Sequence, residues 1–329
     1  MRIPIREVES FLINKLLAEG FTRSEARIIS DEYVLAELKG IRSHGIFAFL
    51  RGGYWTSKRK PIGAGRARRF QVIRNHPGYA YIDGRGDAGQ LAAHSAIRIA
   101  VQKAKKAGVA MVGGGNIQGF LRPGTWAEWA AEQGMISICL IYGGGPLLAP
   151  TGSREPILST NPIGIGIPYT PYPIVIDMAT SERAYNYVKL ATTLGIKVDS
   201  TWGIDKQGKS TTDPKKLIAV LPFGGYKGYA LSLAFEILTG PLVRTPIGKK
   251  TTLKRGFLFL VINPLAFTSK KAFQTETHEL IHSIKAAKRL PGVREIHIPG
   301  EKSSKLEALQ RKRGWFDIDE KIIKDIKAL

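Results

Sequence analysis

The feature that most constrains the fold is a repeated alternation of helical segments and short apolar runs. Residues 89–107 are predicted to form a long helix, Gly108 ends it, and the apolar run 109–112 follows directly. The same order recurs at 126–133 and then 136–142. Helices that alternate with buried strands are typical of proteins in which helices cover a sheet. The sequence therefore predicts an α/β fold and not an all-helical one.

Further elements are predicted on both sides of this region. Apolar residues at helical spacing predict a helix over 5–19 that ends at Gly20, and a second helix that begins at Ser24 and ends at Gly40. The other predictions are strands at 78–83, 174–177 and 257–262 and helices at 181–194, 226–239, 303–313 and 318–328. No Gly-x-Gly-x-x-Gly stands at a strand-to-helix turn, and no glycine-rich turn ends in Gly-Lys-Ser/Thr. Neither a Rossmann domain nor a P-loop is therefore predicted.

The composition is that of a soluble protein with a full hydrophobic core. The chain has 329 residues, 43% of them apolar, which favours two domains. Cys139 is the only cysteine, so the sequence offers neither an internal disulfide nor a cysteine-based zinc cluster. It has no apolar run long enough to span a bilayer, and the N-terminus lacks the apolar core of a secretory signal. We expect a soluble cytoplasmic protein without a bound metal.

The charge is strongly positive, because 49 Lys plus Arg against 27 Asp plus Glu give a net charge of +22. Such a field attracts polyanions and anionic substrates. The densest basic run contains Lys58-Arg59-Lys60, Arg66, Arg68, Arg69 and Arg74. Small residues fill this run, whereas a nucleic-acid groove uses aromatic side chains spaced among the charges. A solvated basic surface is the simpler interpretation, and nucleic-acid binding is the alternative.

The tetrapeptide Arg42-Ser43-His44-Gly45 directly follows the second predicted helix. A histidine beside a hydroxyl group and a glycine is suited to general acid–base catalysis, because the ordinary pKa of histidine lies nearest neutrality. A tetrapeptide alone is not specific, so the alternative is a histidine at the surface or packed in the core.

Other segments, in order along nearly the whole chain, favour the catalytic interpretation. They are Gly89-Gln90, Arg154-Glu155-Pro156, Thr160-Asn161-Pro162, residues 177–181, residues 211–214, residues 222–229 and Pro299-Gly300-Glu301. With these segments the chain resembles the type 2 malate/L-lactate dehydrogenase family of NAD(P)-dependent oxidoreductases. That family includes sulfolactate and ureidoglycolate dehydrogenases and a reductase of cyclic imino acids. The resemblance implies a non-Rossmann α/β dehydrogenase fold with a mixed sheet and flanking helices.

The resemblance also implies a division of the chain, a reaction and an assembly. A central NAD(P)-binding domain would span 120–275, and residues 1–119 and 276–329 would form a helical, substrate-side domain. The implied reaction is hydride transfer between NAD or NADP and a small 2-hydroxy or 2-imino acid. The implied partner is a second copy of the chain, in a homodimer or a higher homo-oligomer.

The family pattern implies roles for matching residues. His44 would give or take the proton at the substrate, and Ser43 and Asp177 would orient and polarise the imidazole. Asp177 has the alternative role of a strand-end carboxylate that caps the following helix. The implied cofactor-binding residues are Asn161, Met178, Ala179, Thr180, Gly224 and Lys227. Glycine there allows the backbone to approach a phosphate or ribose closely.

Departures from the family pattern fall within the expected site. The family's carboxylate-binding arginine, four residues after the histidine, is Ala48 here, and a substrate-facing histidine of the family corresponds to Ile117. Arg42 or Arg51 is then expected to hold the acid group of the substrate. Two further departures are Tyr142-Gly143 and Tyr185-Asn186-Tyr187, where the family has Thr-Asn and Arg-Gly-Lys.

These departures leave three interpretations. In the first, the chain is an active oxidoreductase whose pocket suits a larger or less polar substrate than malate. In the second, it is a family member that has lost its chemistry and serves as a binding or structural protein. In the third, it is a basic nucleic-acid-binding protein. Losing one charged substrate contact typically costs about 2–5 kcal/mol, so an unchanged malate or lactate specificity is not expected. The retention of His44 and Asp177 favours the oxidoreductase.

Overall fold

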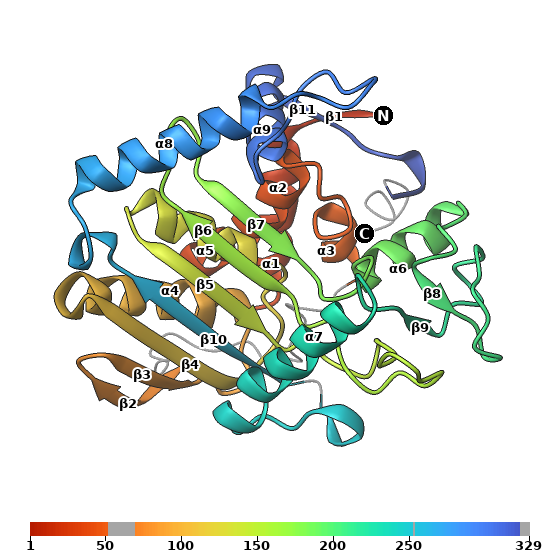
Figure 1. The fold of residues 1–329 in the computed structure, drawn as a ribbon. Helices are drawn as coiled ribbons and strands as arrows, with labels where there is room; N and C mark the ends of the chain where they lie inside the picture. Colours follow the sequence, from red (N-terminus) through yellow and green to blue (C-terminus); the bar gives the residue numbers. More distant parts are fainter. Residues whose placement is uncertain (52–69, 253, 323–329) are drawn as a thin grey trace.

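The computed structural model describes residues 1–51, 70–252 and 254–322. Its centre is a seven-stranded sheet in the order β2-β3-β4-β10-β5-β6-β7 (Figure 1). The strands are β2 (Gln71–His76), β3 (Tyr79–Asp83), β4 (Val109–Ile117), β5 (Ile136–Ile141), β6 (Ile163–Ile167), β7 (Ile174–Met178) and β10 (Arg255–Ile262). β3 and β4 are parallel, and the other neighbours in this sheet are antiparallel. This mixed sheet confirms the predicted fold class.

Helices cover both faces of the sheet. Phe257 and Phe259 of β10 share a core with α4 (Gly89–Ala107) and α5 (Pro123–Glu132) on one face. Leu258 points the other way and packs with Phe235 of α7 (Tyr226–Thr239), which lies in front of the sheet in Figure 1. Side chains that alternate between two buried faces are the signature of a central strand.

The N-terminal helices form a second core beside the sheet. It contains buried residues of α1 (Ile5–Ala18), α2 (Arg23–Leu38) and α3 (Ile46–Leu50), together with Phe316 of β11 (Trp315–Asp317). β1 (Arg2–Pro4) pairs with β11, so the N-terminal and C-terminal segments meet. α2 begins one residue earlier than predicted, because Thr22 and Glu25 form a capping box.

A buried ion-pair cluster ties these helices to the sheet layer. Lys39, which follows α2, is only 5% exposed. Its Nζ lies 2.9 Å from Oε1 of Glu128 on α5 and 3.0 Å from Oε2 of Glu307 on α9 (Glu301–Arg313). One buried cation therefore holds three helices that lie far apart in the sequence.

The remaining elements lie around this framework. They are α6 (Tyr185–Leu194), α8 (Lys270–Ala286), β8 (Gly203–Ile204), β9 (Ala219–Val220) and the 3₁₀ helices η1 (Pro241–Val243), η2 (Gly248–Lys250) and η3 (Pro264–Ala266). α8 and strands β2 and β6 were not predicted from the sequence. Within the described residues, no helix combines the length and the apolar composition needed to cross a bilayer.

The sheet continues across the predicted domain boundary between residues 119 and 120. β4 precedes this boundary and pairs along its length with β10, which belongs to the predicted central domain. The two predicted parts therefore share one sheet. Most of the basic run, including Lys58, Arg59, Lys60 and Arg66, lies outside the described residues, and so do residues 323–328 of the last predicted helix.

Candidate active site

A cavity of about 530 Å³ opens at the edge of the sheet where β5 and β7 end and β6 and β10 begin. The loops after α2, β5 and β7 line it, together with the first turns of α5 and α6. Small-molecule sites typically measure about 300–1,000 Å³, so this cavity has the size of a ligand site. It brings together segments that are more than one hundred residues apart in the sequence, including residues 40–44 and 177–179.

His44 lines the cavity, and Ser43 holds its ring. The hydroxyl oxygen of Ser43 lies 2.9 Å from Nδ1 of His44. The pKa of His44 is lowered from 6.5 to about 4, mainly by burial; the positive charge of Arg122 also lowers it, while the charge of Asp177 raises it. The imidazole is therefore neutral at pH 7, and the Ser43 contact leaves Nε2 for a ligand.

The loop that carries His44 is fixed by its neighbours. The backbone N–H of His44 donates to the carbonyl of Ile41 at 2.9 Å, and the N–H of Ile46 donates to Oε2 of Glu37 at 3.2 Å. A Cβ at position 45 would lie only 2.1 Å from Oε2 of the same Glu37, so Gly45 is required for this turn. Gly45 thus allows the loop to pack closely against α2.

A buried ion pair stands in the same cavity. Nε of Arg122 lies 2.8 Å from Oδ2 of Asp177, and the arginine side chain is only 4% exposed. Asp177 acts on His44 through its charge, and the hydrogen bond that it accepts in this structure comes from Arg122. The structure therefore places His44, Ser43 and Asp177 in the lining of one cavity, together with an arginine that was not predicted.

Glycine residues explain how α5 reaches this position. A Cβ on Gly164 of β6 would lie 2.5 Å from the carbonyl carbon of Pro123, and one on Gly124 would lie 2.4 Å from Cγ of Asp177. Because Gly164 and Asp177 are also paired across β6 and β7, the first turn of α5 rests directly on these strands. Arg122, the residue before the first turn, is thereby carried to the end of β7.

The predicted cofactor residues fall into two groups. Met178 and Ala179 line the cavity. Thr180 is fully buried behind them, and both its N–H and its hydroxyl donate to the carbonyl of Thr160 at 2.9 Å. Asn161 is also buried, and its amide donates to Ser232 and Glu236. Gly224 and Lys227 lie outside the lining, although the N–H of Gly224 donates to Glu182, which does line the cavity.

The predicted substrate residues are placed unevenly. Arg42 is exposed and lines the cavity. Arg51 lies outside the lining and donates to the hydroxyl of Thr193 at 3.2 Å. Ile117 is fully buried in the core under α4 and α5, which corrects the expectation that it faces the substrate. Ala48 is buried in the N-terminal core, so α3 brings no charge to the cavity. Tyr142, Tyr185 and Tyr187, which stand where the sequence departs from the family pattern, all line the cavity.

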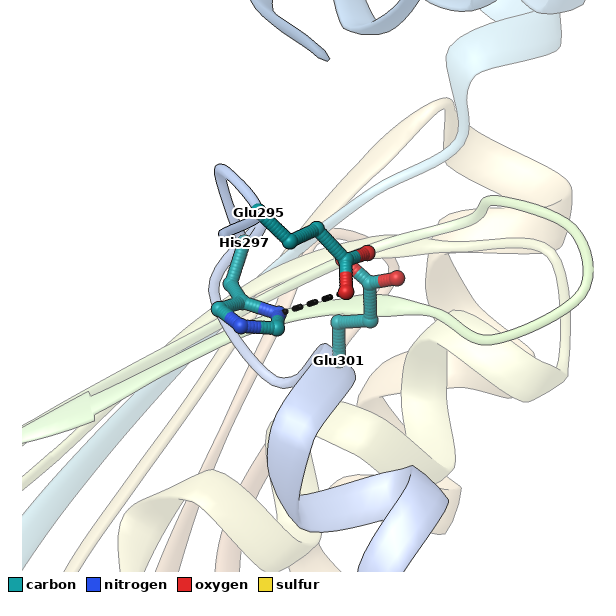
Figure 2. Close-up of side chains that lie close together, drawn as sticks. All are labelled: Glu295, His297 and Glu301. Atoms are coloured by element: carbon teal, nitrogen blue, oxygen red, sulfur yellow. Dashed lines mark ion pairs between the residues drawn. The ribbon is translucent and has the colours of Figure 1, made fainter. Parts of the chain in front are cut away.

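A separate group of carboxylate and imidazole side chains lies before and at the start of α9. Glu295, His297 and Glu301 point toward one another in Figure 2, and their potential ligand atoms lie within 4.8 Å of each other. Lys285 and Lys305 neutralise Glu301, at 2.8 and 2.7 Å from its Oε1, and these contacts lower the pKa of that carboxyl group to about 2. Ion pairing with two lysines accounts for this group without a metal ion.

Comparison with known proteins decides the family. A sequence model described as Malate/L-lactate dehydrogenase matches residues 3–327. The chain belongs to the malate/L-lactate dehydrogenase family. It is 34% identical over 330 residues to L-sulfolactate dehydrogenase of Methanocaldococcus jannaschii, covering 98% of this chain and 94% of that protein. It is 32% identical over 310 residues to Delta(1)-pyrroline-2-carboxylate/Delta(1)-piperideine-2-carboxylate reductase of Pseudomonas putida, covering 89% of each.

The fold agrees with this assignment. The crystal structure of malate dehydrogenase from Entamoeba histolytica matches with a TM-score of 0.88 at 27% identity, covering 99% of this chain and 96% of that chain. The predicted family and fold class are thus confirmed. Because the family's members are dehydrogenases and reductases, this malate/L-lactate dehydrogenase family member is an oxidoreductase.

Proposed function

We propose that the cavity at His44 is the site of hydride transfer between NAD or NADP and a small 2-hydroxy or 2-imino acid. The observation that carries the proposal is one cavity in which a half-buried imidazole, held by Ser43, stands beside the Arg122–Asp177 ion pair. The named relatives include a sulfolactate dehydrogenase and a reductase of cyclic imino acids, which act at a carbon beside a carboxylate.

His44 is proposed to move the proton that accompanies the hydride. In the oxidation direction the neutral imidazole accepts the hydroxyl proton at Nε2 while the C2–H bond breaks and the hydride leaves. In reduction the same nitrogen returns the proton to the carbonyl oxygen or the imine nitrogen. The nicotinamide ring supplies or accepts the hydride when it is bound. Ser43 keeps the imidazole in place through Nδ1, and the charge of Asp177 favours the protonated ring.

The residues around the cavity fit a dinucleotide. Met178 and Ala179 offer backbone at the lining, and the basic side chains Arg183, Lys189 and Arg255 line the same space, where they suit an anionic pyrophosphate. Thr180 and Asn161 would support this loop from behind. Gly224 and Lys227, at the start of α7, would meet a phosphate or ribose beyond the cavity, because Gly224 is bonded to the lining residue Glu182.

The pH profile of turnover tests the role of His44. Its lowered pKa, about 4, means that the free protein holds the neutral base over the whole neutral range. For oxidation of a 2-hydroxy acid, kcat/KM reports the free enzyme and is expected to stay flat from pH 8 to about pH 5, then to fall tenfold per pH unit below about pH 4. The measurement is the appearance of reduced nicotinamide absorbance at each pH. A half-maximal rate at pH 6.5 or above would contradict this assignment.

We also propose that a second copy of the chain covers α7. This helix exposes Tyr226 (69%), Leu233 (43%) and Ile237 (49%), which lie on one side at helical spacing. A contiguous exposed apolar stripe of this kind marks an interaction surface. The double change Leu233→Lys with Ile237→Lys is expected to reduce the particle mass in light scattering from a multiple of 36.1 kDa to 36.1 kDa. Leu309→Lys, on exposed α9, is the matched control and should leave the mass unchanged; an unaltered mass in the α7 variant would refute the proposal.

A further inference from the structure

Arg122 has hydrogen-bond donors that the described residues do not use. Its side chain is 4% exposed and lines the cavity, and Asp177, which accepts from Nε, is its one hydrogen-bond partner among the described residues. Nη1 is buried without any partner there. An arginine has five N–H donors, and leaving a buried donor without an acceptor is unfavourable. This end of the guanidinium is therefore suited to an acceptor that a ligand brings.

Three of the other arginines near the cavity are less well placed for a buried ligand, and the fourth, Arg255, is half-buried and is assigned above to the pyrophosphate. Arg51 lies outside the lining, and Arg42 is exposed. Arg183 stacks on Tyr187 and Trp202, with its guanidinium carbon 4.2 and 5.3 Å from the ring centres. Arg122 alone of these is buried beside the imidazole, and its charge reaches His44, whose pKa it helps to lower.

From these observations we propose that Arg122 binds the carboxylate of the substrate, in place of the arginine that position 48 lacks. A carboxylate accepts two parallel hydrogen bonds from a guanidinium fork, which fixes the acid and with it the neighbouring C2 atom. This inference rests on the proposed function, because it assigns the acid-binding residue of the same cavity. It makes the free carboxylate, and not a neutral amide or ester, the feature by which the site selects its substrate.

The charges around Arg122 nearly cancel, so the cavity can bind one more anion. Asp177 balances the arginine, and His44 is neutral at pH 7. Glu32, buried nearby on α2, has its pKa raised to about 8 by burial, so its carboxyl group is mainly protonated at pH 7. A bound carboxylate therefore adds a negative charge to a cluster that is close to neutral, and this charge also stabilises a protonated His44, the form that donates a proton.

Binding of oxamate, an anionic analogue of a 2-oxo acid, tests the proposal. Isothermal titration calorimetry is done on the full chain with saturating NADH or NADPH, with neutral oxamide as the matched ligand. Arg122→Gln is expected to weaken oxamate binding about 30-fold or more, because truncating one partner of a buried charged pair costs about 2–5 kcal/mol. Arg122→Lys keeps the charge without the fork and is expected to lose about tenfold. Arg51→Gln removes the same charge outside the cavity and should change the Kd less than threefold.

A second variant separates ligand binding from a purely structural role. If Arg122 served only to hold Asp177, Asp177→Asn would lose oxamate as Arg122→Gln does. The proposal instead predicts that Asp177→Asn binds oxamate at least as tightly as the wild-type protein, because the guanidinium then has no competing carboxylate. Thermal melting and reduced-nicotinamide affinity of each variant report whether the fold and the cofactor site are intact.

The outcomes distinguish this inference from the proposed function. Wild-type protein that binds reduced nicotinamide but not oxamate, or an Arg122→Gln variant with unchanged oxamate affinity, overturns the role of Arg122 and leaves the cofactor site standing. Wild-type protein that binds neither compound overturns both. Should Arg122→Gln fail to fold, Arg122→Lys decides: a wild-type Kd for oxamate contradicts the requirement for the fork, and a tenfold weaker Kd with intact cofactor binding supports it.

Discussion

His44→Ala is expected to lower kcat by about 10²–10⁴-fold, the usual contribution of a positioned general acid–base group. The imidazole is the titratable group of the cavity that Ser43 holds at 2.9 Å, and its removal leaves the hydroxyl proton of the substrate without a nearby acceptor. Steady-state kinetics in both directions, with the substrate that supports wild-type turnover, give the loss. The affinity for reduced nicotinamide should stay within threefold, since His44 acts on the substrate.

Two comparisons make this result specific. Ser43→Ala removes only the contact that holds Nδ1, so a smaller loss of about tenfold is expected, of the size that one hydrogen bond contributes. The variants and the wild-type protein must have similar fold stability, and a thermal melt of each one checks this. Wild-type turnover by His44→Ala would show that the proton travels through another group and that the role given to this histidine is wrong.

Lys39→Met is expected to destabilise the fold by about 3–5 kcal/mol, because it leaves the buried carboxylate of Glu128 without its cation. Nζ of Lys39 lies 2.9 Å from Glu128 and 3.0 Å from Glu307, and it also donates to the hydroxyl of Ser304 at 3.5 Å. The side chain joins α2 to α5 and α9, so the loss should loosen the contact between the N-terminal core and the sheet. Urea unfolding at pH 7 measures the change.

The matched control is Lys285→Met. Lys285 also contacts a glutamate at 2.8 Å, but this ion pair is on the surface and is screened by water. Its loss should shift the urea midpoint far less than the loss of Lys39. Adding Glu128→Gln to Lys39→Met should restore part of the lost stability by removing the buried charge that has lost its cation. Equal midpoints for the two lysine variants would contradict the importance given to burial.

Local sequence signals predicted much of the fold. The helix over 89–107 was predicted with the bounds that α4 has, because Gly108 takes a positive φ of 82° that ends it. The loop at 42–45 and the strand ending at Asp177 were also found, since a glycine and a strand-end carboxylate mark them locally. The short strands β2 and β6 and the helix α8 were missed, because β2 is exposed along its length, β6 alternates isoleucine with glycine, and α8 buries only Ile281.

The candidate site was predicted less completely, because its charged residues pair with residues that are distant in the sequence. Arg122 precedes the Pro-Gly start of a helix, and nothing local indicates that it meets Asp177, 55 residues away. Ile117 was assigned to the substrate by a motif alignment, whereas its position at the end of β4 directs it into the core under Gly84. Lys39 likewise looks like a solvated lysine in the sequence, and only the packing of α5 and α9 shows that it is buried.

The most direct test of a nicotinamide-dependent active site at His44 is a fluorescence titration of the purified protein with NADH and with NADPH at physiological salt. Saturable binding of at least one of them, followed by its oxidation on addition of a 2-oxo acid or a cyclic 2-imino acid, is the predicted result. A folded protein that binds neither nucleotide would contradict the proposed function, and the cavity would then serve binding without hydride transfer.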